Sequence, residues 1–291
     1  MKKLLFGLTI ALIAGSLMSW HWEKTQFEPV NKANVIECLN METQQAYKLE
    51  ASTPGFAALH PAPVVVNPEN LLGKMTQFEA ADGKTANAYF IPSKKKSKKW
   101  LVVIQEWWGL NDNIKLESDK YYAALGDMNV IAVDMYDGKV AATPDSAMKL
   151  MRGADMARMN AIIQGAIKYA GADAAIYSVG WCFGGMWSLQ TAIIAGPQAK
   201  GTVMYYGRPE TNMEKLKSIK CDVIGFFGNQ DQAPSPAMVN EFEKNMKEAG
   251  KNLSVNRYEA NHGFANPSNP SFNPTATADA YAKAIAFLKS H

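Results

Sequence analysis

The sequence predicts an α/β fold in which helices cover both faces of a mostly parallel, twisted sheet. After residue 70, short apolar runs of strand length alternate with longer amphipathic stretches of helix length. The apolar runs are continuous rather than alternating, which is typical of strands buried on both faces. Hydrophobic residues make up 47% of the 291 residues and charged residues 20%, so the chain can bury one large core and a single domain is expected.

This domain is expected to span residues 71–291 and to begin with a hairpin. Asp82-Gly83 separates the first two strands and tolerates the positive φ of a tight turn. The predicted strands are Met75–Ala80, Thr85–Ile91, Trp100–Gln105, Val130–Asp134, Ile176–Trp181, Thr202–Tyr206, Val223–Gly228 and Ser254–Tyr258. The predicted helices are Ile114–Leu125, Asp145–Tyr169, Phe183–Ala195, Pro236–Ala249 and Ala278–Leu288. Ser235 before Pro236 is a strong helix start, because serine caps the first turn and proline there loses no hydrogen bond.

The first 70 residues are expected to lie outside this domain. Lys2 and Lys3 precede the apolar run Leu4–Ala14, which predicts a signal peptide over residues 1–20 and export to the periplasm or the medium. No clean Ala-x-Ala site follows, so an uncleaved membrane anchor is the alternative. Prolines interrupt residues 21–70, which we interpret as an extension on the domain surface with one helix within Asn34–Leu49.

Charge and cysteine content limit the partners. The net charge of +3 is too small to indicate a nucleic-acid partner, and the lysines of residues 94–99 are interpreted as a solvated loop between two strands. Nothing in the pattern indicates an oligomer, so a monomer is expected. Of the three cysteines, Cys182 is the candidate for an unpaired thiol, whereas Cys38 and Cys221 could form a disulfide or remain two buried thiols.

A nucleophile-elbow motif stands between one strand and the next helix. After Ile176–Trp181 the chain reads Gly180-Trp181-Cys182-Phe183-Gly184-Gly185, the pattern Gly-x-Ser-x-Gly with cysteine in place of serine. The elbow is a strained turn, and side chains at the glycine positions would collide with the neighbouring strand and helix. The amino end of the helix favours a thiolate. A buried structural cysteine in a glycine-rich turn is the alternative.

An acid and a base follow later strands. Asp231 comes after Val223–Gly228, and His262 comes after Ser254–Tyr258. The order cysteine, aspartate, histidine is that of the α/β-hydrolase fold, in which the acid fixes the tautomer of the imidazole. Alone, Asp231 could cap a turn and His262 could be a surface histidine, but their placement after consecutive strands favours a catalytic triad. His21, His60 and His291 show no such setting.

Glu106 is a further candidate, at the end of the strand Trp100–Gln105. In serine hydrolases of this fold, the loop after this strand supplies a backbone N–H to the oxyanion hole. A carboxylate beside that N–H must have a polar partner or lie in water.

Together these motifs resemble the dienelactone hydrolase family over residues 71–291. The resemblance rests on Gln105-Glu106 with Gly109-Leu110-Asn111, the elbow, Tyr205-Tyr206-Gly207, Asp231 and His262-Gly263-Phe264. It implies Cys182 as nucleophile, His262 as base and then acid, Asp231 as orienter, and Glu106 as a switch that interacts with the cysteine before substrate binds. Backbone N–H groups of Trp107 and Phe183 would form the oxyanion hole.

One departure puts the substrate of that family in doubt. Its enzymes for chlorinated dienelactones hold the substrate carboxylate with arginines, one of which falls at Asn266 here. Arg208 or Arg152 could supply the cation instead, or both could be solvated charges. The pocket is expected to be lined by Trp108, Tyr206, Arg208 and Phe264.

The predicted reaction is hydrolysis of a small-molecule ester, lactone or thioester through an acyl thioester on the cysteine. No metal or organic cofactor is expected, because no cluster of His, Cys or carboxylate residues has useful spacing along the chain. Two alternatives are an exported binding protein that keeps the elbow only as structure, and a redox-sensing thiol protein.

Overall fold

A computed structural model describes residues 42–64 and 67–291. The predicted signal peptide, the first half of the predicted Asn34–Leu49 helix and Cys38 lie outside the described residues. Within the described part of the chain, no helix is both long enough and apolar enough to cross a membrane.

An eight-stranded sheet forms the centre of the molecule, in the order β1-β2-β4-β3-β5-β6-β7-β8. The first two strands pair antiparallel with each other, β2 pairs antiparallel with β4, and all other neighbours are parallel. This is the predicted α/β-hydrolase architecture. The strands are β1 Lys74–Glu79, β2 Thr85–Ile91, β3 Lys99–Ile104, β4 Asn129–Val133, β5 Ala175–Trp181, β6 Ala199–Tyr205, β7 Asp222–Gly228 and β8 Leu253–Tyr258.

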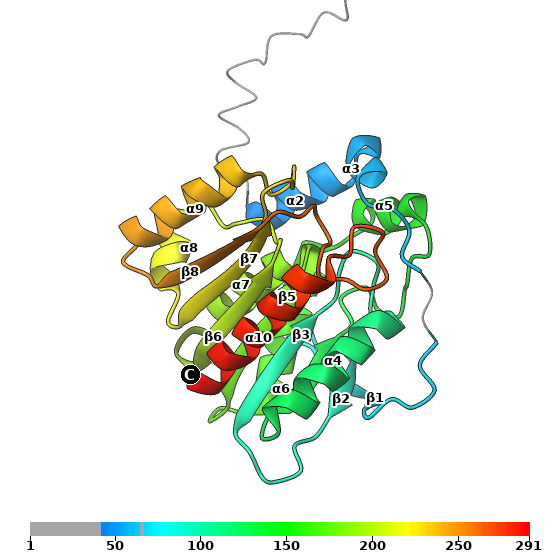
Figure 1. Cartoon of the computed structure of the whole chain (residues 1–291). Coiled ribbons are helices and arrows are strands. Elements are labelled where there is room, and N and C mark those ends of the chain that lie inside the picture. Colours follow the sequence, from blue (N-terminus) through cyan, green and yellow to red (C-terminus); the bar gives the residue numbers. More distant parts are fainter. Residues whose placement is uncertain (1–41, 65–66) are drawn as a thin grey trace, which may run out of the picture. The chain divides into compact units, whose positions relative to one another are not determined.

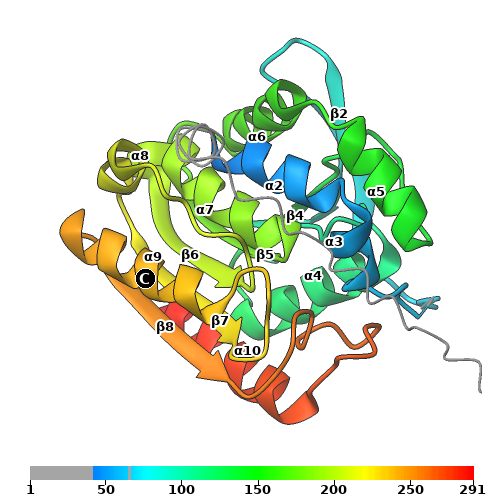
Figure 2. The ribbon, with the colours of Figure 1, turned by 90° about the horizontal axis from the view of Figure 1, so that it is seen from above.

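Helices cover both faces of this sheet (Figures 1 and 2). On one face α4 packs on β2, β3 and β4, and α10 packs on β6 and β7. On the other face α6 packs on β1 and β4, and α7 on β3, β5 and β6. The α-helices are α2 Thr43–Ala51, α3 Pro54–Ala58, α4 Asp112–Leu125, α5 Pro144–Arg152, α6 Met156–Ala170, α7 Phe183–Ala195, α8 Met213–Ser218, α9 Pro236–Glu248 and α10 Pro274–Ser290, and the 3-10 turn η1 is Gly196–Gln198.

One predicted helix is wrong as a single element. The stretch Asp145–Tyr169 forms two helices, because α5 ends at Arg152 and α6 begins at Met156. Asp155 starts the second helix by accepting hydrogen bonds from the N–H groups of Ala157 and Arg158 at 2.9 and 3.2 Å. A side-chain cap of this kind satisfies the first free N–H groups of a new helix, so the chain can change direction while its apolar periodicity continues.

Residues 42–64 of the predicted extension pack on the domain. Their two helices, α2 and α3, lie beside α5 (Figure 2), and α2 also contacts α7. Tyr47, Ala51 and Phe56 are buried in the main apolar core. We call residues 42–64 the cap segment.

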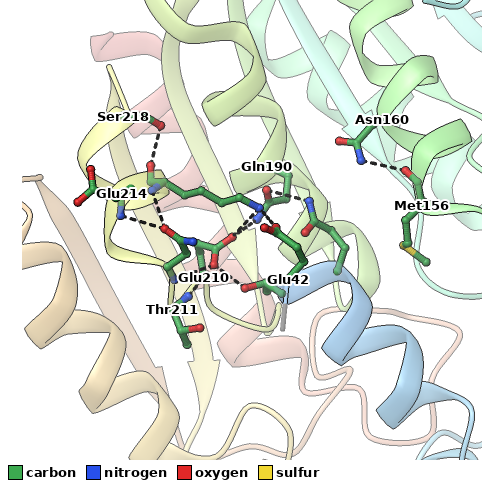
Figure 3. A network of polar contacts seen from close by, with 12 residues as sticks. Glu42, Met156, Asn160, Gln190, Glu210, Thr211, Glu214 and Ser218 are labelled. Atoms are coloured by element: carbon green, nitrogen blue, oxygen red, sulfur yellow. Dashed lines mark hydrogen bonds and ion pairs between the residues drawn. The ribbon is translucent and has the colours of Figure 1, made fainter. Parts of the chain in front are cut away.

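A buried polar network holds the start of the cap segment (Figure 3). Thr43 Oγ1 donates to Glu210 Oε1 at 2.6 Å, and Gln190 Nε2 donates to Glu210 Oε2 at 2.8 Å. Gln44 Nε2 in turn donates to Gln190 Oε1 at 3.0 Å. The Glu210 side chain is only 1% exposed, so these hydrogen bonds compensate its burial and fix α2 against α7.

Candidate active site

The elbow places Cys182 in a strained turn between β5 and α7. Cys182 has φ 55° and ψ −116°, a region that residues with a Cβ rarely occupy. The close approach of the backbone shows how tight the turn is. A Cβ on Gly180 would lie 2.1 Å from the carbonyl oxygen of Gly184, and a Cβ on Gly184 would lie 2.2 Å from the carbonyl oxygen of Ile104. Glycine at both positions therefore allows the turn that lifts the sulfur to the end of the strands.

Asp231 and His262 meet the cysteine at this end of the sheet. His262 Nδ1 donates to Asp231 Oδ2 at 2.8 Å, and Asp231 Oδ1 accepts from the N–H of Ala233 at 2.9 Å. The Nε2 atom of His262 lies within 4.8 Å of Cys182 Sγ and, among the described residues, has no hydrogen-bond partner. The aspartate thus orients the ring through Nδ1 and turns Nε2 towards the sulfur, where the two groups can exchange a proton.

Charge determines the proton affinity of His262. Burial lowers its pKa, but the opposing charges of Asp231 and Cys182 outweigh burial and hold the pKa well above its ordinary value. An imidazolium is therefore stabilised between the sulfur and the aspartate, as a base that accepts a thiol proton requires.

The cap segment brings two further groups to the sulfur. The Tyr47 hydroxyl lies 3.3 Å from Cys182 Sγ, and His60 Nε2 lies 3.9 Å from it. His60 also stacks on Phe56, with ring centroids 3.8 Å apart, and its ring centroid is 4.6 Å from that of His262. The expectation that His60 has no special setting is wrong, because packing of α3 carries it into the site.

His60 is held as a neutral imidazole. Its Nδ1 donates to the carbonyl oxygen of Phe56 at 2.7 Å, so Nε2 is left with a lone pair that faces the sulfur. Burial, followed by the positive field of His262, lowers the pKa of His60 to about 3. His60, Cys182 and His262 meet in space although they are far apart in the chain, so spacing along the chain does not reveal this group of possible metal ligands.

Glu106 is buried near the same end of β3. Its Oε2 accepts a hydrogen bond from Asn266 Nδ2 at 2.5 Å, so Asn266 provides the polar partner that a buried carboxylate needs. Burial raises the pKa of Glu106 to about 7, although the positive field of His262 and the Asn266 hydrogen bond oppose the rise. In the described part of the chain, no hydrogen bond joins Glu106 to Cys182, and the sulfur contacts Tyr47 instead.

The backbone N–H groups of the two predicted oxyanion-hole residues are free of acceptors in the described part of the chain. Phe183 is the first residue of α7, and Trp107 follows Glu106 in the loop after β3. Both residues are fully buried, so these donors are in a low-dielectric setting, where an oxyanion would be stabilised most.

Both candidate arginines are engaged by the cap segment. Arg208 forms an ion pair with Glu50, and Arg152 donates from Nε and Nη2 to the carbonyl oxygen of Ser52 at 3.0 and 2.9 Å. In this arrangement both groups hold the cap in place.

The aromatic residues predicted for the pocket are buried, and Tyr206 packs against the ring of His262 with ring centroids 4.9 Å apart. Tyr206 and Phe264 pack edge to face with ring centroids 5.3 Å apart, and Trp108 is 2% exposed. Cys182 itself is 2% exposed. A cavity of about 260 Å³ opens beside His262 and is lined by Asp231 and His262 together with Ala58, Leu59 and His60 of the cap segment. Cys182 and the predicted pocket residues Trp108, Tyr206, Arg208 and Phe264 do not line this cavity.

The sheet order and the cysteine at the elbow define a protein of the α/β-hydrolase fold. Residues 86–291 match the model of the dienelactone hydrolase family, and the chain belongs to this family. It is similar to Protein usf of Aquifex pyrophilus, with 26% identity over 233 residues that cover 76% of this chain and 99% of the relative. It is also similar to carboxymethylenebutenolidase 1 of Cupriavidus pinatubonensis, with 25% identity over 232 residues, 75% of this chain and 97% of the relative.

A solved structure shows the same fold. A dienelactone hydrolase-like promiscuous phosphotriesterase from metagenomic libraries superposes with a TM-score of 0.63 and 22% sequence identity, over 75% of this chain and 98% of that one. Family membership and these relatives identify the chain as a hydrolase that acts on ester bonds.

Proposed function

We propose that the protein hydrolyses a small ester or lactone through a thioester on Cys182, with His262 as base and Asp231 as its orienter. The observation that carries this proposal is the 2.8 Å hydrogen bond from His262 to Asp231, which leaves His262 Nε2 unpaired within 4.8 Å of the elbow sulfur. A nucleophile, a base and an orienting acid in this relation are the parts that acyl transfer needs.

In the first half of the reaction, His262 Nε2 takes the thiol proton as the sulfur of Cys182 attacks the carbonyl carbon. The carbonyl oxygen becomes an oxyanion and accepts hydrogen bonds from the N–H groups of Trp107 and Phe183. The intermediate then collapses to a thioester, and the alcohol or enol leaves with the proton from His262.

In the second half, His262 takes a proton from water, and the resulting hydroxide attacks the thioester carbonyl. The carbon–sulfur bond breaks, the acid product leaves, and the proton returns to the sulfur. Asp231 remains ionised throughout and stabilises the imidazolium in both steps.

The cap segment limits the size of the substrate. Cys182 is 2% exposed, and the cavity beside His262 holds about 260 Å³. We therefore propose a small acyl group that enters when the cap segment moves away from the sulfur. Because Arg208 pairs with Glu50, a substrate with a carboxylate would have to displace Glu50 to use this arginine.

The test compares a panel of p-nitrophenyl esters and small lactones on the wild type, Cys182→Ala and Asp231→Asn. Cys182→Ala should lose at least about 10³-fold in kcat, and Asp231→Asn about 10³–10⁴-fold, because the imidazole then adopts the wrong tautomer. Cys221→Ala is the matched control and should keep wild-type kinetics. Full turnover by Cys182→Ala, or by wild type after complete alkylation of Cys182, would exclude the cysteine mechanism.

A further inference from the structure

We propose that Cys182 Sγ, His60 Nε2 and His262 Nε2 together bind one zinc ion and leave its fourth coordination position open. The three atoms lie within 4.8 Å of one another, with 3.9 Å between the sulfur and His60 Nε2. In tetrahedral zinc sites, bond lengths of about 2.3 Å to sulfur and about 2.05 Å to nitrogen put neighbouring ligand atoms about 3.3–3.6 Å apart. The side chains therefore need to close by about 1.5 Å at most to hold the ion.

Both imidazoles are oriented through Nδ1, so that Nε2 is the atom left for a metal. His60 Nδ1 donates to the Phe56 carbonyl oxygen at 2.7 Å, and His262 Nδ1 donates to Asp231 Oδ2 at 2.8 Å. Histidines that bind zinc almost always donate their other N–H to a carbonyl or a carboxylate in this way. Each ring therefore turns Nε2 towards the sulfur, and zinc takes the place of any proton that His262 carries on this atom.

Acyl transfer does not account for the second imidazole. The proposed hydrolysis uses one histidine, which Asp231 orients, whereas His60 comes from the cap segment and has no carboxylate partner among the residues that the structure describes. One sulfur and two nitrogens suit zinc, while calcium and magnesium prefer oxygen ligands. The cavity lined by His60 and His262 gives an ion a route to the three atoms.

Zinc binding changes what the site can do. The one proton shared by the Cys182 thiol and His262 is released to solvent as the zinc bonds to sulfur and to His262 Nε2 form, and the ion then occupies the atom with which His262 would accept a proton. A zinc-loaded protein should therefore be inactive in acyl transfer, and removal of the ion should restore turnover. This inhibition rests on the proposed function, whereas the binding of the ion does not.

Metal binding is tested on the full chain after reduction and removal of metals with a chelator. Zinc affinity and stoichiometry are measured by competition with a chromogenic chelator, and cobalt is used as a spectroscopic probe of the sulfur ligand. The wild type should bind one zinc ion, and its cobalt form should show a thiolate-to-metal charge-transfer band. His60→Gln should weaken zinc binding at least about tenfold, and Cys182→Ala should abolish the band. His291→Gln removes an exposed histidine and should bind zinc as the wild type does.

A wild type that binds no zinc under these conditions, or a His60→Gln variant that binds zinc as tightly as the wild type, would overturn the proposal. X-ray absorption of the zinc-loaded wild type gives a second test that needs no variant. One sulfur and two imidazole nitrogens around the ion support the proposal, and a single imidazole contradicts it. These readouts do not depend on ester hydrolysis, so they separate failure of the metal site from failure of the hydrolase mechanism.

Discussion

The buried carboxyl of Glu106 should make stability depend on pH in a way that Glu106→Gln removes. Burial is the largest cause of its raised pKa, since the side chain lies at the end of β3 with Asn266 as its hydrogen-bond partner. Glutamine keeps an oxygen that can accept from Asn266 but carries no charge. The variant therefore removes the ionisation of residue 106 with little change of shape.

The magnitude follows from the pKa. A rise from the ordinary value of 4.5 to about 7 corresponds to about 3 kcal/mol, at about 1.4 kcal/mol for each pH unit. Below pH 4.5 the carboxyl is protonated in both states and contributes no pH-dependent penalty. Between pH 4.5 and 7 the unfolded chain loses this proton while the folded protein keeps it, so stability falls as the pH rises. Above about pH 7 the full penalty is present.

Urea unfolding of both proteins at pH 4 and pH 8 measures this difference. We expect Glu106→Gln to be more stable than the wild type by up to about 3 kcal/mol at pH 8, and by at most about 0.5 kcal/mol at pH 4. Glu241→Gln, on the exposed face of α9, should show the same difference from wild type at both pH values. A variant that is no more stable than the wild type at pH 8 would refute the argument from burial.

Two further predictions concern the elbow and the sulfur. Gly184→Ala puts a Cβ 2.2 Å from the carbonyl oxygen of Ile104 and should lower the stability by about 1–3 kcal/mol, measured by thermal unfolding. In the control Gly153→Ala the added Cβ meets its first neighbour at 3.6 Å, so this variant should be near neutral. Equal melting temperatures of the two variants would contradict this prediction. Tyr47→Phe removes the hydroxyl that lies 3.3 Å from the sulfur, and loss of about 1 kcal/mol of thiolate stabilisation should slow alkylation of Cys182 by iodoacetamide about fivefold at neutral pH. Faster alkylation of the variant would show that the hydroxyl shields the sulfur rather than stabilising its anion.

The strands, and the candidate catalytic residues that follow them, could be predicted because each strand carries a strong local signal in the sequence. The eight apolar runs become the eight strands, and no boundary moves by more than three residues. The largest change is at the start of β6, where Ala199 replaces the predicted Thr202. The elbow glycines and the residues after β7 and β8 also place the cysteine, the aspartate and the histidine at one end of the sheet. In a parallel sheet this end is fixed by topology, so sequence position after a strand is enough to locate such a residue.

Other features had weaker local signals. The helices α5 and α6 share one continuous apolar periodicity, so only the Gly153 and Asp155 pair marks the break between them. The start of α3 had a usable signal, since Thr53 accepts from the N–H of Phe56 at 3.2 Å and Pro54 follows it. That signal predicts a short helix but not where this helix docks.

The place of His60 could not be predicted, because it depends on tertiary packing. The histidine reaches the sulfur since Phe56 and Tyr47 are buried in the core and carry the cap segment over the elbow. No spacing along the chain encodes this contact. For Glu106, in contrast, the sequence does predict that a polar partner is needed, because a carboxylate at a strand end cannot be buried alone. The structure shows that this partner is Asn266.

The most direct test of the central claim is to find where the acyl group is bound during turnover. Wild-type protein is mixed with a p-nitrophenyl ester, quenched in acid within milliseconds and digested, and the peptides are analysed by mass spectrometry. The proposed mechanism predicts an acyl adduct, labile to hydroxylamine, on the peptide that contains Cys182, and none on this peptide in Cys182→Ala. An adduct on another residue, with turnover preserved in that variant, would contradict it.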